Sequence, residues 1–246
     1  MAEDILTVMW KESKSILRYS SSRWKGLLTL LTPIALFGII FPIQFRATWL
    51  TSGWSVAVSI ATPLMLVATT IAESFAGERE RHTLETLLAS RLPDRAILFG
   101  KLLMSLIFGW GMTLFLLVVS MIVVNILEWN GSFQMYQASI LGINIAASLL
   151  VSGLVSSLGI LISLRSPTVQ SAAQTIMLML FMPLLLLQAV VFLLPSFLPQ
   201  ETIMELLDRM DFNTIMLVIL VVLLAITIGL SLGAWMRFKR SKLILS

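Results

Sequence analysis

The sequence contains no cysteine and only one histidine, His82. Without cysteine, the chain cannot form disulfides, thiolate metal sites or a thiol nucleophile. Its one histidine lies in a charged stretch, which excludes a Ser/His pair inside an apolar segment and a histidine-based metal centre. The chain also lacks the GxxxxGK[ST] run that cradles nucleotide phosphates, so it cannot be its own ATPase. We therefore expect no catalytic residues, no metal site and no cofactor in this chain.

Charged residues are scarce as well. They make up 12% of the chain, whereas hydrophobic residues make up 58% and the mean hydropathy is +0.95. Soluble domains average about 45–50% apolar and about 25% charged residues, so lipid must solvate most of this chain. Six charge-free intervals hold at least 20 residues each and can cross the roughly 30 Å hydrocarbon layer as helices: Gly26–Phe45, Ala47–Ala72, Leu102–Leu127, Trp129–Leu164, Ser166–Gln200 and Phe212–Met236. The sequence predicts an all-α integral membrane protein with six transmembrane helices.

We expect these helices at about residues 27–44, 54–73, 94–127, 138–164, 168–194 and 213–236. Asp94 follows Pro93 and is expected to cap the third helix. Pro63 and Pro183 fall inside helices 2 and 5, where neighbouring groups in a bundle satisfy the carbonyl that a proline leaves without its donor. No repeat or linker interrupts the chain. We expect one domain over 1–246, with an arm (1–25), a six-helix bundle (26–236) and a basic tail (237–246).

The lysines and arginines predict the orientation. Fifteen of the 17 fall in the arm, the segment between helices 2 and 3, the turn after helix 4 and the tail. The other side carries only Arg46 and Arg209, together with five acidic residues. Because basic residues accumulate on the cytoplasmic side of membrane proteins, both termini are expected in the cytoplasm. The basic pI of about 9.8 follows from this topology and from lipid headgroups, so we expect no nucleic-acid partner.

Residues 2–25 have the pattern of an amphipathic helix. Basic residues recur on one face, apolar residues cover much of the rest, and the tryptophans suit the level of the lipid headgroups. We expect this arm to lie on the inner membrane surface. Its candidate interfacial residues are Trp10, Lys11, Lys14, Arg18 and Trp24. The alternative is a solvated N-terminal helix.

Small residues recur at helical spacing in two of the predicted helices. Ser148, Ser152 and Ser156 lie four residues apart in the fourth, and Gly229 and Gly233 form a GxxxG in the sixth. Such spacing lets helix backbones approach closely in lipid. Packing within one subunit is the favoured interpretation, and a seam between two subunits is the alternative.

The predicted spans contain neutral polar residues, whereas every ionisable residue is expected at or beyond a helix end. Secondary carriers and proton pumps usually place ionisable groups inside the membrane. An ion-coupled transporter or channel is therefore the less favoured alternative, with sodium coupling through neutral groups still open. If the protein moves a substrate uphill, we expect the energy to enter from outside the bilayer.

One segment departs from the general scarcity of charge. "AGERERHTLETLLASR", Ala76–Arg91, holds six charged residues among sixteen and joins helix 2 to helix 3 on the predicted cytoplasmic side. It can form a short helix in which Leu84, Leu87 and Leu88 make an apolar strip. The residues support two interpretations equally: a docking helix for a soluble partner, and a hydrophilic loop held by lipid phosphates.

The region "IAESFAGERERHTLETLLASRLPDRAILFGKLL", Ile71–Leu103, resembles the motif region of type-2 ATP-binding-cassette (ABC) export permeases. In that family an acid ends helix 2, a G-E-x-E-x-x-T-L-E-x-L-L-x-[ST] run follows, and G-K opens helix 3. The matching positions are Glu73, Gly77, Glu78, Glu80, Thr83, Leu84, Glu85, Leu87, Leu88, Ser90, Gly100 and Lys101. Arg91 stands where the family often has proline, and Pro93 comes two residues later.

The resemblance implies the permease subunit of an ABC exporter. Such a subunit pairs with a second permease, a homodimer being expected, and binds a cytoplasmic ABC ATPase that holds the ATP and magnesium. The loop between helices 2 and 3 would be a short coupling helix seated on the ATPase, and the arm would act as a lever on the membrane. The implied ATPase contacts are Glu78, Arg79, Glu80, Arg81, Thr83, Leu84, Leu87 and Leu88. A multi-pass protein of a prokaryotic plasma (inner) membrane is implied, with a non-transport membrane scaffold as a further alternative.

"MPLLLLQAVVFLLPSFLP", Met182–Pro199, resembles the family's fifth helix and the approach to its outer gate. In the loop that follows, apolar residues recur at helical spacing over 203–210, which predicts a short amphipathic helix on the outer side. The candidate outer-gate residues are Pro183, Gln188, Ile203 and Leu206.

Overall fold

The computed structural model describes residues 1–18, 31–83, 86–87, 89–197 and 212–237. These residues form helices joined by turns, and no strand occurs among them. The helices in chain order are α1 (Ala2–Arg18), η1 (Ile34–Ile40), α3 (Phe41–Phe45), α4 (Thr48–Thr51), α5 (Trp54–Ala72), η2 (Glu73–Gly77), α6 (Glu78–Glu80), α8 (Asp94–Leu127), α9 (Ala138–Ser163), α10 (Val169–Phe197) and α12 (Phe212–Arg237). The segments η1 and η2 are π-helical, so their backbone bonds join residues five apart rather than four.

Four helices in the described part of the chain are long and apolar enough to cross a membrane: Trp54–Glu80, Asp94–Leu127, Ala138–Ser163 and Asn213–Trp235. They correspond to predicted spans 2, 3, 4 and 6. Predicted span 1 coincides with a shorter apolar helix, Leu31–Phe45, and predicted span 5 with another, Val169–Pro183, within α10. The all-helical class and the multiple apolar helices are thus confirmed, and the count of six spans stays a prediction.

Most helix ends agree closely with the pattern of charge. α8 covers 94–127 as predicted, and α9 ends one residue before its predicted end. The predicted cap at Asp94 is wrong, because Pro93 occupies the cap position and Asp94 is already helical. Pro93 adopts an extended conformation (φ −68°, ψ 145°), and its carbonyl accepts the N–H groups of Ala96 and Ile97 at 2.9 and 3.2 Å. The proline therefore starts the helix with its backbone.

The second predicted helix extends further than expected. α5 ends at Ala72, but the helical backbone continues through η2 and α6 to Glu80. Glu73, expected at the end of a helix, therefore lies inside a continuous helical run. This run carries the start of the charged segment beyond the apolar part of the bundle.

The core forms where α5 packs against α8 and α9, and glycines make the close approach possible. Val67 and Ile71 of α5 are fully buried there. A Cβ added at Gly109 of α8 would lie 2.1 Å from Cγ2 of Val67, and one at Gly159 of α9 would lie 2.2 Å from Cγ2 of Ile71. In lipid, where apolar surface is already solvated, such close contact drives helix association.

Hydroxyl and amide groups add specific bonds to this core. Ser59 Oγ of α5 donates to Asn144 Oδ1 at 2.7 Å, and Asn144 Nδ2 donates to Ser55 Oγ at 3.2 Å. These bonds fix the register of α5 on α9 because no water competes for the polar groups. The serine run of the predicted fourth helix is also buried inside this chain, which confirms the favoured interpretation for it: Ser148, Ser152 and Ser156.

The glycine run of α12 has a different environment. A Cβ added at Gly229 or Gly233 would meet nothing within 4 Å. α9 packs instead on another face of α12, where Thr227 Oγ1 approaches the carbonyl of Leu150 at 3.3 Å and Ala234 is buried. In the described chain, no neighbouring helix approaches these two glycines closely, and both interpretations of this glycine pair stay open.

An aromatic cluster marks the end of the bundle opposite to α6. Phe45 stacks on Trp54 with ring centroids 5.0 Å apart and on Trp49 at 5.9 Å. Trp129 and Phe133, in the loop after α8, are exposed at the same end. Aromatic residues gather at the level of lipid headgroups, so this cluster indicates a membrane boundary.

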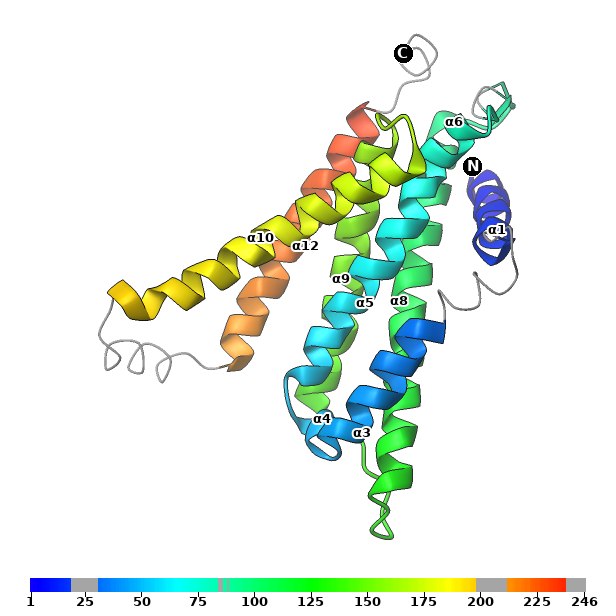
Figure 1. Ribbon diagram of the computed structural model, residues 1–246. Coiled ribbons are helices and arrows are strands. Elements are labelled where there is room, and N and C mark those ends of the chain that lie inside the picture. The colour runs from blue at the N-terminus through cyan, green and yellow to red at the C-terminus, as the bar shows by residue number, and fades with distance from the viewer. Residues whose placement is uncertain (19–30, 84–85, 88, 198–211, 238–246) are drawn as a thin grey trace.

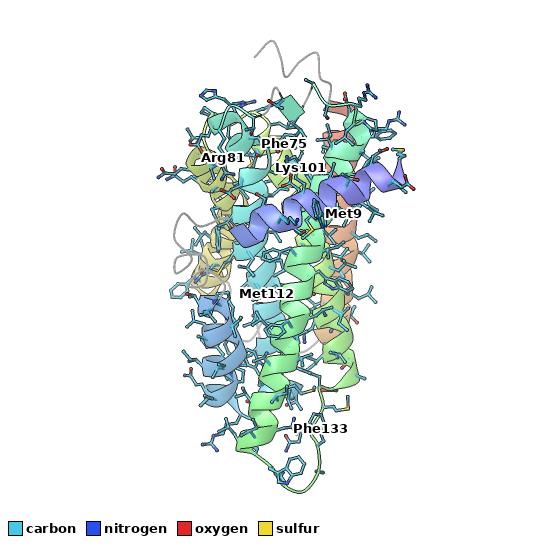
Figure 2. All side chains as sticks on the ribbon, turned by 90° about the vertical axis from the view of Figure 1, so that its right-hand side faces the viewer. Met9, Phe75, Arg81, Lys101, Met112 and Phe133 are labelled. Atoms are coloured by element: carbon cyan, nitrogen blue, oxygen red, sulfur yellow. The ribbon has the colours of Figure 1, made fainter. Side chains whose placement is uncertain are left out.

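Figure 1 shows α5, α8 and α9 running side by side, with α12 along α9 and α10 leaning away from α12 toward the aromatic end. α1 lies across α8 near α6, as Figure 2 shows from a second direction. It covers residues 2–18 of the arm predicted over 2–25, and residues 19–25 lie outside the described part. The end that carries α1, α6 and the start of α8 is called the charged end below.

Replacing Gly159 by alanine is expected to destabilise the protein, because the added methyl group would force Ile71 and α5 away from α9. Overpacking of this kind costs about 1–3 kcal/mol, seen as a lower thermal unfolding midpoint in lipid nanodiscs. Gly142→Ala on the same helix is the matched control, because a Cβ there meets nothing within 4 Å. It should be neutral or slightly stabilising. Equal effects of the two substitutions would contradict this packing.

Candidate functional site

The charged end gathers most of the residues that the sequence marked as functional. The helical run from α5 through η2 delivers α6 and the turn at residues 81–83 to this end. α1, the first turns of α8 and the turn after α9 surround them. In Figure 2, Arg81, Phe75 and Lys101 lie together at this end, beside the point where α1 crosses α8.

A serine from α9 holds the π-helical segment η2. Ser163 Oγ accepts the N–H groups of Phe75 at 3.2 Å and Ala76 at 3.0 Å, and it donates to the carbonyl of Ala72 at 2.9 Å. A π-helical turn disturbs the ordinary four-residue bonding, and such turns frequently occur at functional sites. Here one buried hydroxyl satisfies three backbone groups and fixes the base of α6.

Four charged side chains form an ionic cluster: Lys11, Glu12, Glu78 and Lys101. The Nζ atom of Lys101 lies 2.9 Å from Glu12 Oε1 and 3.2 Å from Glu78 Oε1, and it donates to the carbonyl of Ser74 at 2.6 Å. Lys11 Nζ also donates to Glu78 Oε1, at 2.5 Å. The two ammonium groups balance the two carboxylates, so the cluster is neutral.

Lys101 corrects an expectation drawn from the sequence. Its side chain is only 1% exposed, and it lies within α8 rather than at or beyond a helix end. A buried ammonium group is tolerated only when it is paired and hydrogen-bonded. The sequence could not show this pairing, because Glu12 and Ser74 are distant from Lys101 along the chain. The signals that the sequence did offer were the match of Lys101 to the family motif and its place next to a long apolar run.

Arg79 points back into the protein. Its Nη1 donates to the carbonyl of Ser166 at 2.7 Å and its Nη2 to the carbonyl of Leu164 at 2.8 Å. These carbonyls follow the C-terminal end of α9, where helix geometry leaves acceptors unsatisfied and favours a positive charge. Arg79 therefore ties α6 to the turn between α9 and α10.

The tip beyond α6 faces outward. Glu80, Arg81, His82 and Thr83 are exposed, and His82 adopts a left-handed backbone conformation with φ 55°. The N–H of Thr83 donates to the carbonyl of Glu78 at 2.9 Å, which closes the turn. The exposed Arg81 lies 3.5 Å from the half-buried Glu73 in an ion pair. The tip thus offers both signs of charge on a fixed turn.

The predicted coupling residues therefore fall into two groups. Glu78, Arg79 and the half-buried Leu87, which packs against the core, are directed inward. Glu80, Arg81 and Thr83 are exposed. The described part of the predicted coupling segment consists of α6, the turn at 81–83 and the helical residues Thr86 and Leu87, whereas Leu84 and Leu88 lie outside the described residues. The coupling helix therefore stays a prediction.

The arm presents two environments. On one side Val8 is buried against α8, and Lys11 and Glu12 join the ionic cluster. On the other, Trp10 is 62% exposed and Lys14 Nζ lies 3.6 Å above its ring. The remaining predicted arm residues are Arg18, the last residue of α1, whose side chain is not described, and Trp24, which lies outside the described residues.

Two of the four candidate gate residues lie in α10. Pro183 and Gln188 are both exposed in the described chain, in the part of α10 that leans away from the bundle. Ile203 and Leu206, with the amphipathic helix predicted around them, lie outside the described residues. The outer-gate assignment therefore stays a prediction.

Comparison with known families identifies the chain's relationship. The family model of the ABC-2 type transporter matches residues 3–201, and the chain belongs to this family. No match was found among curated proteins or among solved structures. The membrane domain of this family is a permease, distinct from the ATPase with which such permeases normally work. The chain is thus a multi-pass ABC transporter permease, as its resemblance implied.

Replacing Ser163 by alanine is expected to remove the bonds that its hydroxyl makes with two buried N–H groups and one carbonyl of the η2 region. Unsatisfied buried groups cost about 1–3 kcal/mol each, so the unfolding midpoint should fall and amide hydrogen exchange at Phe75 and Ala76 should accelerate. Ser148→Ala is the control, because Ser148 Oγ donates only within α9, to the carbonyl of Ile145. Unchanged exchange at Phe75 and Ala76 would contradict the role assigned to Ser163.

Proposed function

We propose that the chain is the membrane subunit of an ABC exporter and that a separate cytoplasmic ABC ATPase docks on the tip of the charged end. The observation that carries this proposal is the way the tip is held. Arg79 joins it to α9, Glu78 joins it to α1 and α8, and Ser163 braces the backbone below it. A partner that moves this tip would therefore move the helices, rather than a loose loop.

The rest of the architecture follows from this role. The charged end faces the cytoplasm, six helices cross the plasma (inner) membrane of a prokaryote, and the whole chain forms one permease domain. The ATP and magnesium belong to the ATPase, and this chain carries no catalytic residue. The predominance of basic residues at the charged end supports this orientation.

A second copy of the chain is proposed to pack beside α10 and α12. Both helices expose apolar residues along the described part of their length, including Leu185 and Phe192 of α10 and Leu217 of α12. The bare glycines of α12 add a surface on which another helix can approach closely. The path for the substrate would then lie between the two copies.

Reversing the charge of Glu80 tests the docking site. Glu80→Arg is expected to weaken binding of the ATPase subunit to the permease in nanodiscs at least about tenfold, equivalent to about 1.4 kcal/mol, because like charges placed across an interface repel. Glu3→Arg is the matched control, since Glu3 is exposed at the start of α1. Unchanged binding together with unchanged ATP-driven transport would place the docking site elsewhere.

Proteoliposomes that contain only this chain separate the alternatives. Transport driven by an ion gradient without an ATPase would favour an ion-coupled transporter or a channel. A chain that binds no ATPase and transports nothing would be a scaffold.

Pairing through α10 is testable with single cysteines, because the chain has none of its own. Leu185→Cys is expected to form a disulfide between two copies under mild oxidation, seen as a dimer on a non-reducing gel. Phe115→Cys on α8 is the control, because Phe115 is also exposed but lies on a helix not proposed for the seam. Equal cross-linking at the two positions would argue against pairing through α10.

A further inference from the structure

The contacts of Lys101 come from three separate elements. An ammonium group has three N–H donors, and the structure gives this one three acceptors: Glu12 of α1, Glu78 of α6 and the carbonyl of Ser74 in η2. The ring of Phe75 covers the same group, with 5.0 Å between Nζ and the ring centroid. Two hydrogen bonds and one ion pair thus join α8 to three different segments.

We propose that Lys101 is a positioning residue that makes the arm and the docking tip move as one unit on α8. This proposal rests on the proposed function and deepens it. When a partner shifts α6, Glu78 moves with it, and the shared ammonium group draws Glu12 and α1 in the same direction. The arm then receives the motion through the contacts of Lys101 with Glu12 and Glu78, called the ionic joint below, without having to contact the partner itself.

The geometry supports a joint that can slide without breaking. Both ammonium groups of the cluster bind Oε1 of Glu78, while Oε2 of the same carboxylate is buried and has no donor. The cluster therefore holds one unused acceptor. Lys11 or Lys101 can transfer to it during a small shift of α6 and still remain bound to Glu78.

A packing contact next to Lys101 holds the arm on α8 without any charge. A Cβ added at Gly100 would lie 2.6 Å from Cβ of Val8 and 3.2 Å from the carbonyl oxygen of Ile5. The backbone of α1 thus rests directly on α8 at this point. Because packing holds the arm here and charge links it to the tip, removal of the ionic joint need not detach the arm from α8.

The joint is tested with a variant that removes the charges together. Lys101→Met alone leaves two half-buried carboxylates with Lys11 as their one remaining cation in the cluster, which can prevent folding. The triple variant Lys101→Met, Glu12→Gln, Glu78→Gln leaves no uncompensated charge from these three residues, and so it should fold even where the single variant does not. Lys14→Met is the matched control, because Lys14 is an exposed arm lysine with no carboxylate partner among the described residues.

The first measurement uses the permease alone in nanodiscs. Spin labels at Leu6→Cys on α1 and Glu80→Cys on α6 report the distance between arm and tip, and the chain has no cysteine to interfere. We expect one narrow distance peak in the parent and in Lys14→Met, and loss of that peak to a broad distribution in the triple variant. A narrow, unshifted peak in the triple variant would overturn the proposal.

The second measurement uses the permease with its ATPase and follows substrate moved per ATP hydrolysed. In the triple variant this ratio should fall about tenfold, equivalent to about 1.4 kcal/mol. ATPase binding should persist, because Glu78 is directed inward and the exposed tip residues Glu80, Arg81 and Thr83 are unchanged. An unchanged ratio in a variant whose arm has loosened would overturn the transmission role. Failure of the parent to bind any ATPase would instead overturn the proposed function, and the spin-label result would still decide the joint.

Discussion

The ammonium group of Lys101 needs negative partners because it is buried, and that need brings three parts of the chain together at one end of α8. The arm, the π-helical segment and α6 each supply an acceptor. Arg79 likewise finds acceptors in another segment, because its guanidinium group donates to carbonyls that follow the end of α9. The segments at the charged end are thus held together by charged groups that find their partners, whereas the helices in the rest of the bundle are held together by close packing.

The two halves of the bundle differ in how completely they are packed. α5 is wedged between α8 and α9 by glycines, serines and an asparagine, which leaves little room for movement between these three helices. α10 and α12 expose most of their apolar surface in the described chain. A compact half with bonded register and a half with exposed apolar faces is the arrangement expected of a subunit whose remaining contacts come from lipid or from another chain.

The pattern of charge predicted the long helices well, because a charge inside the hydrocarbon layer is costly and its absence delimits a span. The ends of α8 and α9 and the amphipathic arm were accessible for that reason. Contacts between segments that are distant along the chain could not be predicted from the sequence. Nothing local in the sequence indicates that Ser163 bonds η2, that Glu12 reaches Lys101, or that Arg79 turns inward. The charged segment after the second predicted helix was visible in the sequence, but the division of its residues into inward-directed and exposed groups required the structure.

The π-helical segment η2 also sets the direction in which the tip faces. A π-helical turn contains one residue more than an α-helical turn, and each residue of an α-helix advances the chain by about 100° around the axis. Deleting a single residue from η2 would therefore restore ordinary α-helical winding. It would also rotate α6 about the helix axis, so that α6 would face a different direction. The length of this five-residue segment therefore sets the direction in which α6 and the turn after it face.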